Sequence, residues 1–84
     1  MKKQKKHIIS HIIDGSIAQE LEIEPGDELV SINDQPVGDI LDYRYLCNEE
    51  YLVVVIRKPD GEEWELEIEK EFEEDLGMEF ENGM

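Results

Sequence analysis

Residues 14–33 read Asp-Gly-Ser-Ile-Ala-Gln-Glu-Leu-Glu-Ile-Glu-Pro-Gly-Asp-Glu-Leu-Val-Ser-Ile-Asn, and the turns encoded in this stretch decide the fold. Ser16 and Gln19 have the spacing of a capping box, in which the hydroxyl caps one amide and the longer side chain reaches back to another. They predict a short helix over residues 17–21. The Pro-Gly pair within residues 24–27 predicts a type II turn, because Pro presets its second position and Gly allows the positive φ of its third.

Elements on either side of this stretch complete the first half of the chain. Residues 7–13 mix β-branched and polar side chains and end at an Asp-Gly turn signal, which is typical of a strand. The apolar residues of 29–32 predict a second strand, which an Asn-Asp pair then turns. A second helix is expected from about 39 to 48, with Asp39 as its N-cap.

The second half of the chain is predicted to contain a hairpin and a final strand. Residues 51–56 form a continuous apolar run rich in Val, which is typical of a strand buried on both faces or nearly so. A Pro-Asp-Gly turn at 58–61 leads into a strand over 62–72, whose apolar residues alternate with Glu: Trp64, Leu66, Ile68 and Phe72. A last strand is expected at 78–81. The pattern predicts a small α+β domain of five or six strands and two helices.

The charge of the chain limits its partners. Its 84 residues suffice for one compact domain, which we place at residues 7–84 after a flexible basic head at residues 1–6. From His7 onward, 4 basic residues stand against 23 acidic ones, a formal charge of −19. Nucleic acid and anionic membrane surfaces repel such a charge, so a basic partner is expected, unless the acid only keeps the domain soluble.

The sequence offers little for catalysis. Cys47 is the only cysteine, which excludes an intrachain disulfide and a cysteine-bound cluster within this chain. His7 and His11 are the only candidate bases for the serines and for Cys47, and no glycine-rich phosphate loop is present. No apolar run approaches the roughly 18 residues of a membrane span. We therefore expect a cytoplasmic protein that is not an enzyme and holds no metal or cofactor in this chain.

Two segments resemble the central signature of PDZ domains. Asp14–Ala18 lies where that family begins a short helix with Ser-Pro-Ala, and Ile23–Asn33 contains its Gly-Asp pair followed by an apolar strand. Three positions depart from the pattern: Ile17 replaces the usual Pro, Glu22 a common Gly, and Asp34 the Gly that follows Asn in the family. These departures affect a loop and leave the core pattern intact.

The resemblance extends when the chain is read in a circle. Residues 62–72 and Asp75–Phe80 (Asp-Leu-Gly-Met-Glu-Phe) resemble the family's first strand and its Gly-Leu-Gly-Phe loop. In most animal PDZ domains these elements come first, whereas here they come last. The resemblance therefore implies a PDZ-like, partly open β-barrel or sandwich with a permuted strand order.

A peptide-binding site follows from the same resemblance. In PDZ domains the loop directs backbone amides at a terminal carboxylate, and the bound peptide extends the sheet. The donors would be Leu76, Gly77 and Met78, with Phe80 in the strand that follows, and the groove would lie between helix 39–48 and strand 78–81. The alternative is that this apolar segment only joins the core.

Two helix residues complete the site that the resemblance implies. Counted from Asn33, Asp42 takes the position that reads the ligand side chain two before the end, and Leu46 lines the groove one turn later. An acid at that position favours Lys, Arg or Tyr in the ligand. The alternative is that Asp42 only interacts with the dipole at the helix N-terminus.

Charge opposes a simple transfer of this function. Glu73, Glu74 and Asp75 directly precede the proposed loop, and like charges about 4 to 8 Å apart cost on the order of 0.5 to 1 kcal/mol each. An internal or covalently attached segment would avoid that cost.

The whole chain also resembles the N-terminal domain of bacterial iron–sulfur oxidoreductases, where a PDZ-like domain precedes a radical-SAM-like region. This implies a regulatory or docking domain, with any iron–sulfur cluster and S-adenosylmethionine bound in other sequence. We expect the domain to be a monomer. Three functions thus stay open: binding a peptide in trans, packing in cis on a larger enzyme, and serving as a structural cap.

Overall fold

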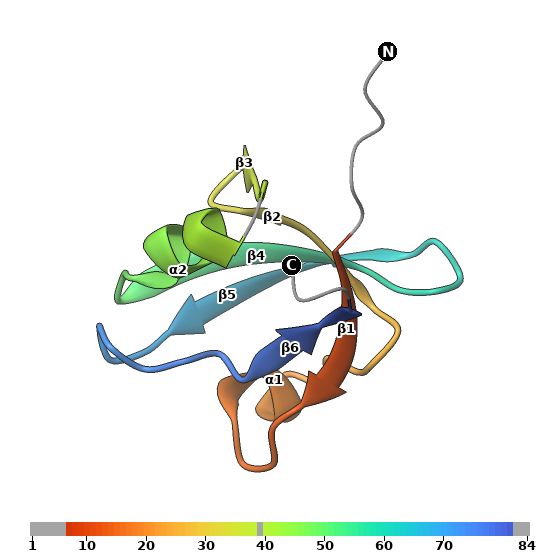
Figure 1. Ribbon diagram of the computed structural model, residues 1–84, viewed down its shortest axis with the longest axis horizontal. Coiled ribbons are helices and arrows are strands. Elements are labelled where there is room, and N and C mark those ends of the chain that lie inside the picture. The colour runs from red at the N-terminus through yellow and green to blue at the C-terminus, as the bar shows by residue number, and fades with distance from the viewer. Residues whose placement is uncertain (1–6, 39, 82–84) are drawn as a thin grey trace.

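The computed structural model describes residues 7–38 and 40–81, which form a small α+β domain as predicted (Figure 1). The elements are β1 (His7–Ile12), α1 (Ile17–Glu20), β2 (Glu28–Ile32), β3 (Gln35–Pro36), α2 (Ile40–Cys47), β4 (Tyr51–Arg57), β5 (Glu63–Glu69) and β6 (Met78–Phe80). The predicted basic head lies outside the described residues. So does Asp39, the predicted cap of the second helix.

The sheet is open and antiparallel, with strand order β5-β4-β2-β1-β6 and with β3 paired to β2. The last two strands of the chain therefore occupy the two ends of this path. β6 pairs with β1, and β5 pairs with β4. The last strand of the chain, β6, therefore lies beside the first, β1, as expected for the permuted order.

The predicted capping box starts α1. Ser16 Oγ accepts the Gln19 N–H at 3.2 Å, as expected. Gln19 Oε1 reaches back to the Gly15 N–H at 2.6 Å, and not to the Ser16 amide, because that amide already donates to the carbonyl of Ile13. The helix ends at Glu20, one residue earlier than predicted.

The predicted type II turn follows α1 and holds a buried carboxylate. The Asp27 N–H donates to the Glu24 carbonyl at 3.1 Å, and Gly26 has a φ of +98°. Asp27 is 1% exposed, and its Oδ2 accepts the Glu24 N–H at 2.9 Å and the Lys58 ammonium at 2.6 Å. Lys58 in turn lies 4.4 Å from the centre of the Trp64 ring. One carboxylate thus ties the turn to the hairpin between β4 and β5.

A two-residue hairpin separates β2 from the short strand β3, which the sequence pattern did not predict. Asn33 and Asp34 both have positive φ, +51° and +65°, as a type I′ turn requires. Asn33 Oδ1 also accepts the Val53 N–H at 2.8 Å, which anchors the turn to β4. α2 then begins at Ile40 and ends at Cys47, within the predicted range of 39–48.

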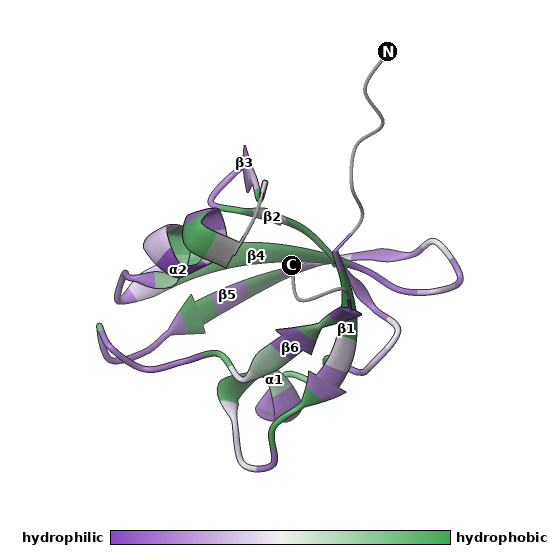
Figure 2. Ribbon diagram, in the orientation of Figure 1, coloured by the Kyte–Doolittle hydropathy of each residue, from purple (hydrophilic) through white to green (hydrophobic). Residues whose placement is uncertain are grey.

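The core lies on the inner side of the sheet and includes residues from both helices. Its fully buried side chains come mainly from β1, β2 and β4, and Figure 2 shows β4 as an almost continuous hydrophobic stretch. The predicted burial of β4 on both faces or nearly so is complete on its inner face and partial on its outer face. Val53 and Val55 are only half-buried, because they pair with the exposed Glu67 and Glu65 of β5 on the outer face.

β5 ends at Glu69, three residues before the predicted end of the strand. Lys70 turns inward at this point, and its ammonium donates to the carbonyls of Glu71 at 3.1 Å and Phe72 at 3.2 Å. The chain therefore leaves the sheet, and Phe72 lies in a turn with 48% of its surface exposed, not on the apolar face of the strand as predicted. The segment from 70 to 77 crosses to β6 at the other end of the sheet (Figure 1).

Candidate functional site

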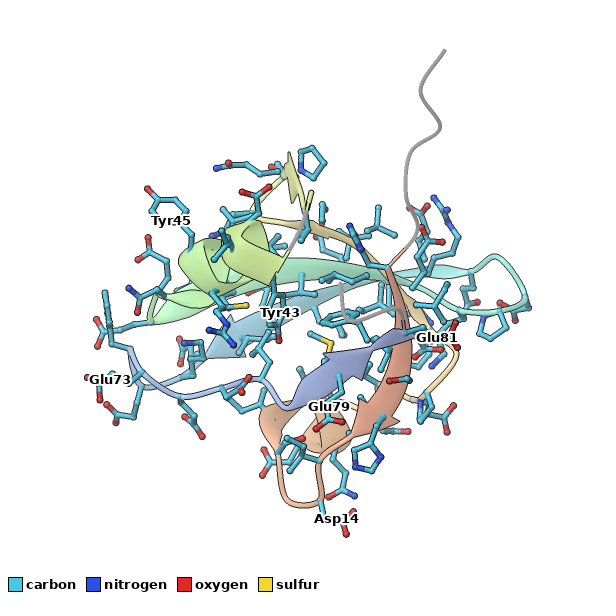
Figure 3. All side chains as sticks on the ribbon, in the orientation of Figure 1. Asp14, Tyr43, Tyr45, Glu73, Glu79 and Glu81 are labelled. Atoms are coloured by element: carbon cyan, nitrogen blue, oxygen red, sulfur yellow. The ribbon has the colours of Figure 1, made fainter. Side chains whose placement is uncertain are left out.

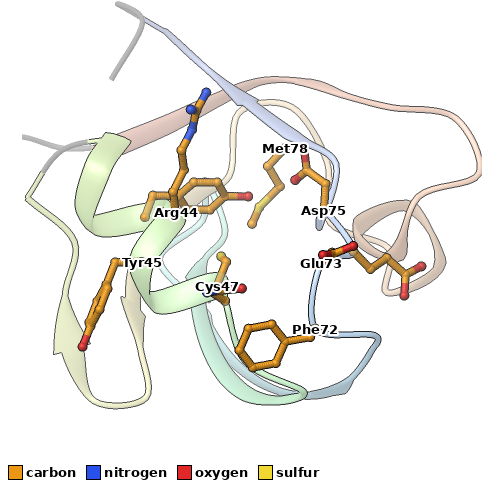
Figure 4. Close-up of a pocket in the computed structure, with 10 residues that line it drawn as sticks. Arg44, Tyr45, Cys47, Phe72, Glu73, Asp75 and Met78 are labelled. Atoms are coloured by element: carbon orange, nitrogen blue, oxygen red, sulfur yellow. The ribbon is translucent and has the colours of Figure 1, made fainter.

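A cleft of about 520 Å³ opens between the second half of α2 and the segment from 72 to 78. Figure 4 shows Cys47 of α2 on one wall and Phe72, Asp75 and Met78 on the other. The cleft lies at the end of the domain where the chain crosses from β5 to β6. Of the groove predicted between helix 39–48 and strand 78–81, the cleft contains part of the helix and, on the strand side, Met78.

The helical wall presents Tyr43 and Cys47, which are four residues apart and so lie on one face of α2. Tyr43 is 6% exposed, and its ring meets Phe80 of β6 edge to face, with 5.2 Å between the ring centres. Tyr45 also lines the cleft, but its ring projects away from the domain and 79% of its surface is exposed (Figure 3). Tyr43 thus joins the helix to β6 and forms the inner end of the cleft.

Tyr43 and Cys47 are both held neutral. Burial raises the pKa of the Tyr43 hydroxyl, and the nearby Cys47 and Asp75 raise it further. Burial also raises the pKa of the Cys47 thiol, to about 11, against smaller opposing effects of Tyr43 and Lys70. The Tyr43 hydroxyl has no hydrogen-bond partner of normal geometry among the described residues, although Cys47 is close enough to affect its pKa. It is a neutral polar group with unused bonding capacity.

The opposite wall contains the Leu-Gly-Met loop of the sequence prediction. Leu76 is buried, and its carbonyl accepts the Ala18 N–H at 2.9 Å. Gly77 has a φ of +91°, and a Cβ at this position would collide with the side chain of Ser16, so only glycine fits. The Gly77 N–H donates to Asp75 Oδ1 at 3.1 Å, so an internal carboxylate already occupies this amide. Met78 lines the cleft.

The two predicted helix residues lie elsewhere. Asp42 borders a second hollow of about 390 Å³, together with His7 and Arg57, and accepts the Gly38 N–H at 3.1 Å just before the helix. That bond corresponds to the alternative given above, an acid at the helix N-terminus. Leu46 is part of the core. The roles of both residues in ligand recognition stay predictions.

Sequence reasoning missed Tyr43, Cys47 and Phe72 as residues of the cleft. The spacing of four between Tyr43 and Cys47 is a signal that was present, because two apolar residues at this spacing mark one helix face. Phe72 gave no such signal, since it continues the alternation of the preceding strand.

β6 borders the cleft and is the terminal strand of the sheet. Among the described residues it pairs with β1 alone, so one of its edges carries no strand. Within residues 7–38 and 40–81, no three His, Cys, Asp or Glu side chains are grouped so as to hold a metal ion. No helix in the same part of the chain is long and apolar enough to cross a membrane.

An open sheet that ends in an unpaired strand edge, with a helix and a cleft beside it, is an arrangement found in domains that bind segments of other proteins. The chain belongs to the PDZ domain family, whose pattern it matches over residues 8–58, more than half of its length. PDZ domains are in general non-catalytic interaction modules. The match ends before β5 and β6, so the permuted correspondence of these two strands rests on their position in the sheet. No curated protein matches the chain.

Proposed function

We propose that this domain docks an extended segment of another protein, or of a longer parent protein, in the cleft between α2 and β6. The segment adds to the free edge of β6 as a further antiparallel strand, and one of its side chains enters the cleft. Backbone hydrogen bonds to β6 provide affinity, and the pocket between Tyr43, Cys47 and Met78 provides selectivity.

The observation that carries this proposal is the buried Tyr43 hydroxyl, which has no hydrogen-bond partner of normal geometry within residues 7–38 and 40–81. It lies next to the edge of β6 that pairs with no other described strand. A buried polar group that lacks a hydrogen bond costs roughly 1–3 kcal/mol. A ligand that supplies the missing bond recovers that free energy, as does one that pairs with the edge of β6. Both features lie at the same cleft, which is the arrangement expected of a docking site.

We further propose that the domain is a regulatory or docking domain of a larger cytoplasmic iron–sulfur oxidoreductase of the radical-SAM-like type. The resemblance of the sequence to the N-terminal domain of such proteins supports this, and a segment attached in cis needs little intrinsic affinity. The domain itself would then bind no cluster and would act as a monomer. The test is to sequence the reading frame that contains the domain. A frame without a cysteine-rich region would contradict the proposal.

A structural cap is the second candidate, and the bond between Asp75 and Gly77 favours it. Because that loop amide is already paired at 3.1 Å, the loop can be satisfied without any ligand. A cap would show no saturable binding in its cleft. The same titration therefore tests both candidates.

The experiment is an amide chemical-shift titration of the labelled domain with a mixed peptide pool, once with free and once with amidated C-termini. Saturable shifts at Tyr43, Gly77 and Met78 are expected. Cys47→Phe fills the cleft and should abolish them, whereas Leu41→Phe, on an exposed position of α2 outside the cleft, should leave them unchanged. No saturable shifts at millimolar peptide, or equal loss in both variants, would refute peptide docking in trans.

A further inference from the structure

The cleft carries an unequal set of charges. Glu73, Glu74 and Asp75 line one wall, and Arg44 is the only cation among the described residues that line the cleft. Lys70 lies nearby, but its ammonium is bonded to the backbone carbonyls of the turn that follows it. Three carboxylates thus face one guanidinium, so the cleft attracts cations and repels anions.

The backbone amide of the loop at Gly77 is not free to bind an anion. The Gly77 amide, which points from the loop, is paired with Asp75 Oδ1 at 3.1 Å. An incoming carboxylate would have to displace this internal carboxylate while it lies among three like charges. Burial is the main cause of the raised pKa of Tyr43 and of Cys47, and the negative charge of Asp75 adds to both shifts.

The inner end of the cleft adds an observation that is independent of the acidic rim. The Tyr43 side chain is more than nine-tenths buried, and its hydroxyl has no hydrogen-bond partner of normal geometry among the described residues, with only the weakly bonding Cys47 thiol close to it. Tyr43 lines the cleft together with Cys47 and Asp75. A neutral phenol can accept a hydrogen bond from an ammonium, a guanidinium or a ligand amide.

The apolar lining suits the stem of a long basic side chain. Phe72 is half exposed at the mouth of the cleft, and Met78 lies on the same wall. Lys and Arg bury their methylene stems along such surfaces while the charged end stays near polar groups. An aromatic face next to the stem adds a favourable contact with the cation.

We propose that the cleft selects an internal segment with a Lys or Arg side chain, and disfavours a free C-terminal carboxylate. The basic side chain enters between Tyr43 and Met78, and its charge pairs with Glu73, Glu74 and Asp75. This inference rests on the proposed docking function and names the chemistry of the ligand. It also assigns the acidic wall a role beyond solubility.

The test uses the full chain and four versions of one octapeptide, Gly-Ser-Thr-Val-Lys-Val-Thr-Gly. The first is acetylated and amidated, the second replaces Lys by Gln, the third replaces it by Glu, and the fourth keeps Lys but has a free C-terminus. We expect the capped Lys peptide to bind roughly three- to tenfold more tightly than the Gln peptide, and the Glu peptide to bind most weakly. The free C-terminus should weaken binding, and the preference for Lys should shrink as salt is raised.

Charge variants locate the effect. The triple variant E73Q/E74Q/D75N should lose most of the preference for Lys over Gln and should bind the free-acid peptide better than the natural domain does. The matched control E20Q/E65Q/E69Q removes the same charge from exposed positions outside the cleft and should keep the preference. Arg44→Gln should strengthen binding of the Lys peptide by a few-fold.

The outcomes separate the two proposals. If none of the four peptides binds, docking in trans fails and the charge selectivity fails with it. If peptides bind but the free-acid version binds best, or if the control triple variant loses the preference as much as the cleft variant, docking stands and the selectivity for a basic internal segment is overturned.

Discussion

The segment of residues 14–33 and the cleft differ in how far their polar side chains are hydrogen-bonded. In the first region, the carboxylate of Asp27 accepts two hydrogen bonds, and Ser16 and Asn33 each cap a backbone amide. In the cleft, the buried hydroxyl of Tyr43 has no hydrogen-bond partner of normal geometry within residues 7–38 and 40–81. The hydrogen bonds of residues 14–33 stabilise the fold, whereas the cleft keeps a hydroxyl that can still bond to a ligand.

Exposure follows the same division. The buried apolar residues of the first region contribute to the core, whereas Phe72 and Tyr45 at the cleft leave large parts of their rings in solvent. Where a protein leaves a buried polar group without a hydrogen bond or a large apolar side chain in solvent, the place is usually a functional site. The four predictions below test whether stability and binding are separated in this way.

Asp27→Ala should have the largest effect. It leaves the Lys58 ammonium, whose side chain is 13% exposed, beside a cavity and without its closest partner. Breaking a buried ion pair in this way costs about 3–5 kcal/mol. Urea unfolding should show a much lower midpoint, with a slope that stays unchanged if unfolding remains two-state.

Asp60→Ala is the matched control for that experiment. Asp60 is exposed in the hairpin turn and accepts only the Glu62 N–H, at 2.9 Å. Its loss should cost about 0.5–1 kcal/mol. Equal losses in the two variants would mean that the stability of the first region does not depend on its buried carboxylate.

Alkaline pH should weaken the domain through the cleft. The pKa of Cys47 rises from an ordinary 9.0 to about 11 on folding, so the folded state holds this proton more tightly than the unfolded one. The resulting stability is complete below pH 9 and is lost as pH rises toward 11, by about 1–2 kcal/mol. Tyr43 acts in the same direction above pH 10, because burial raises its pKa too.

The double variant Tyr43→Phe/Cys47→Ala removes both titrating groups and should flatten the alkaline limb of a plot of unfolding free energy against pH. Thermal unfolding between pH 7 and pH 11 provides the measurement. A limb as steep as that of the natural domain would place the alkaline sensitivity outside the cleft.

The structure of residues 14–33 could be predicted from the sequence better than the cleft could, for a physical reason. The capping box and the type II turn depend on residues three apart in the chain, so their chemistry can be inferred locally from Ser16, Gln19 and the Pro-Gly pair. The single error, the partner of the Gln19 side chain, arose because the Ser16 amide is taken by a carbonyl of the preceding turn. The central PDZ signature was recognisable for the same reason.

The cleft depends on how α2 is rotated against a segment roughly thirty residues away. Each helical residue turns the side chain by about 100°, so an assignment that differs by one position selects another face. The family pattern pointed to Asp42 and Leu46, and each is followed directly by a residue that lines the cleft, Tyr43 and Cys47. The end of β5 at Glu69 could not be predicted either, because the alternation of apolar residues in the sequence continues through Phe72.

Tyr43→Phe should separate stability from binding most directly. It removes a buried hydroxyl without a partner, so the unfolding free energy at pH 7 should stay equal or increase by about 1 kcal/mol. Binding of the capped Lys peptide should weaken, because the ligand loses its bond to the phenol. A loss of stability would show that the hydroxyl has a structural partner, and unchanged affinity would remove it from the binding site.

The smallest effect on stability is expected within residues 14–33, at a position where the backbone is strained. Glu22 has a φ of +66°, in a place where PDZ domains commonly have Gly. A non-glycine residue in this conformation costs about 1–2 kcal/mol, while Gly loses about 0.5–1 kcal/mol through greater freedom of the unfolded chain. Glu22→Gly should therefore stabilise the domain by about 0.5 kcal/mol, measured by urea unfolding.

Glu20→Gly provides the control, because Glu20 is an exposed residue of α1 with an ordinary helical backbone. There the same substitution has no strain to relieve and should destabilise by about 0.5–1 kcal/mol. Opposite signs at two exposed glutamates two residues apart would show that backbone conformation, and not removal of charge, decides the outcome. If both variants lose stability, the strain at Glu22 is compensated by contacts of its own side chain, and even this departure from the family pattern contributes to the stability of the first region.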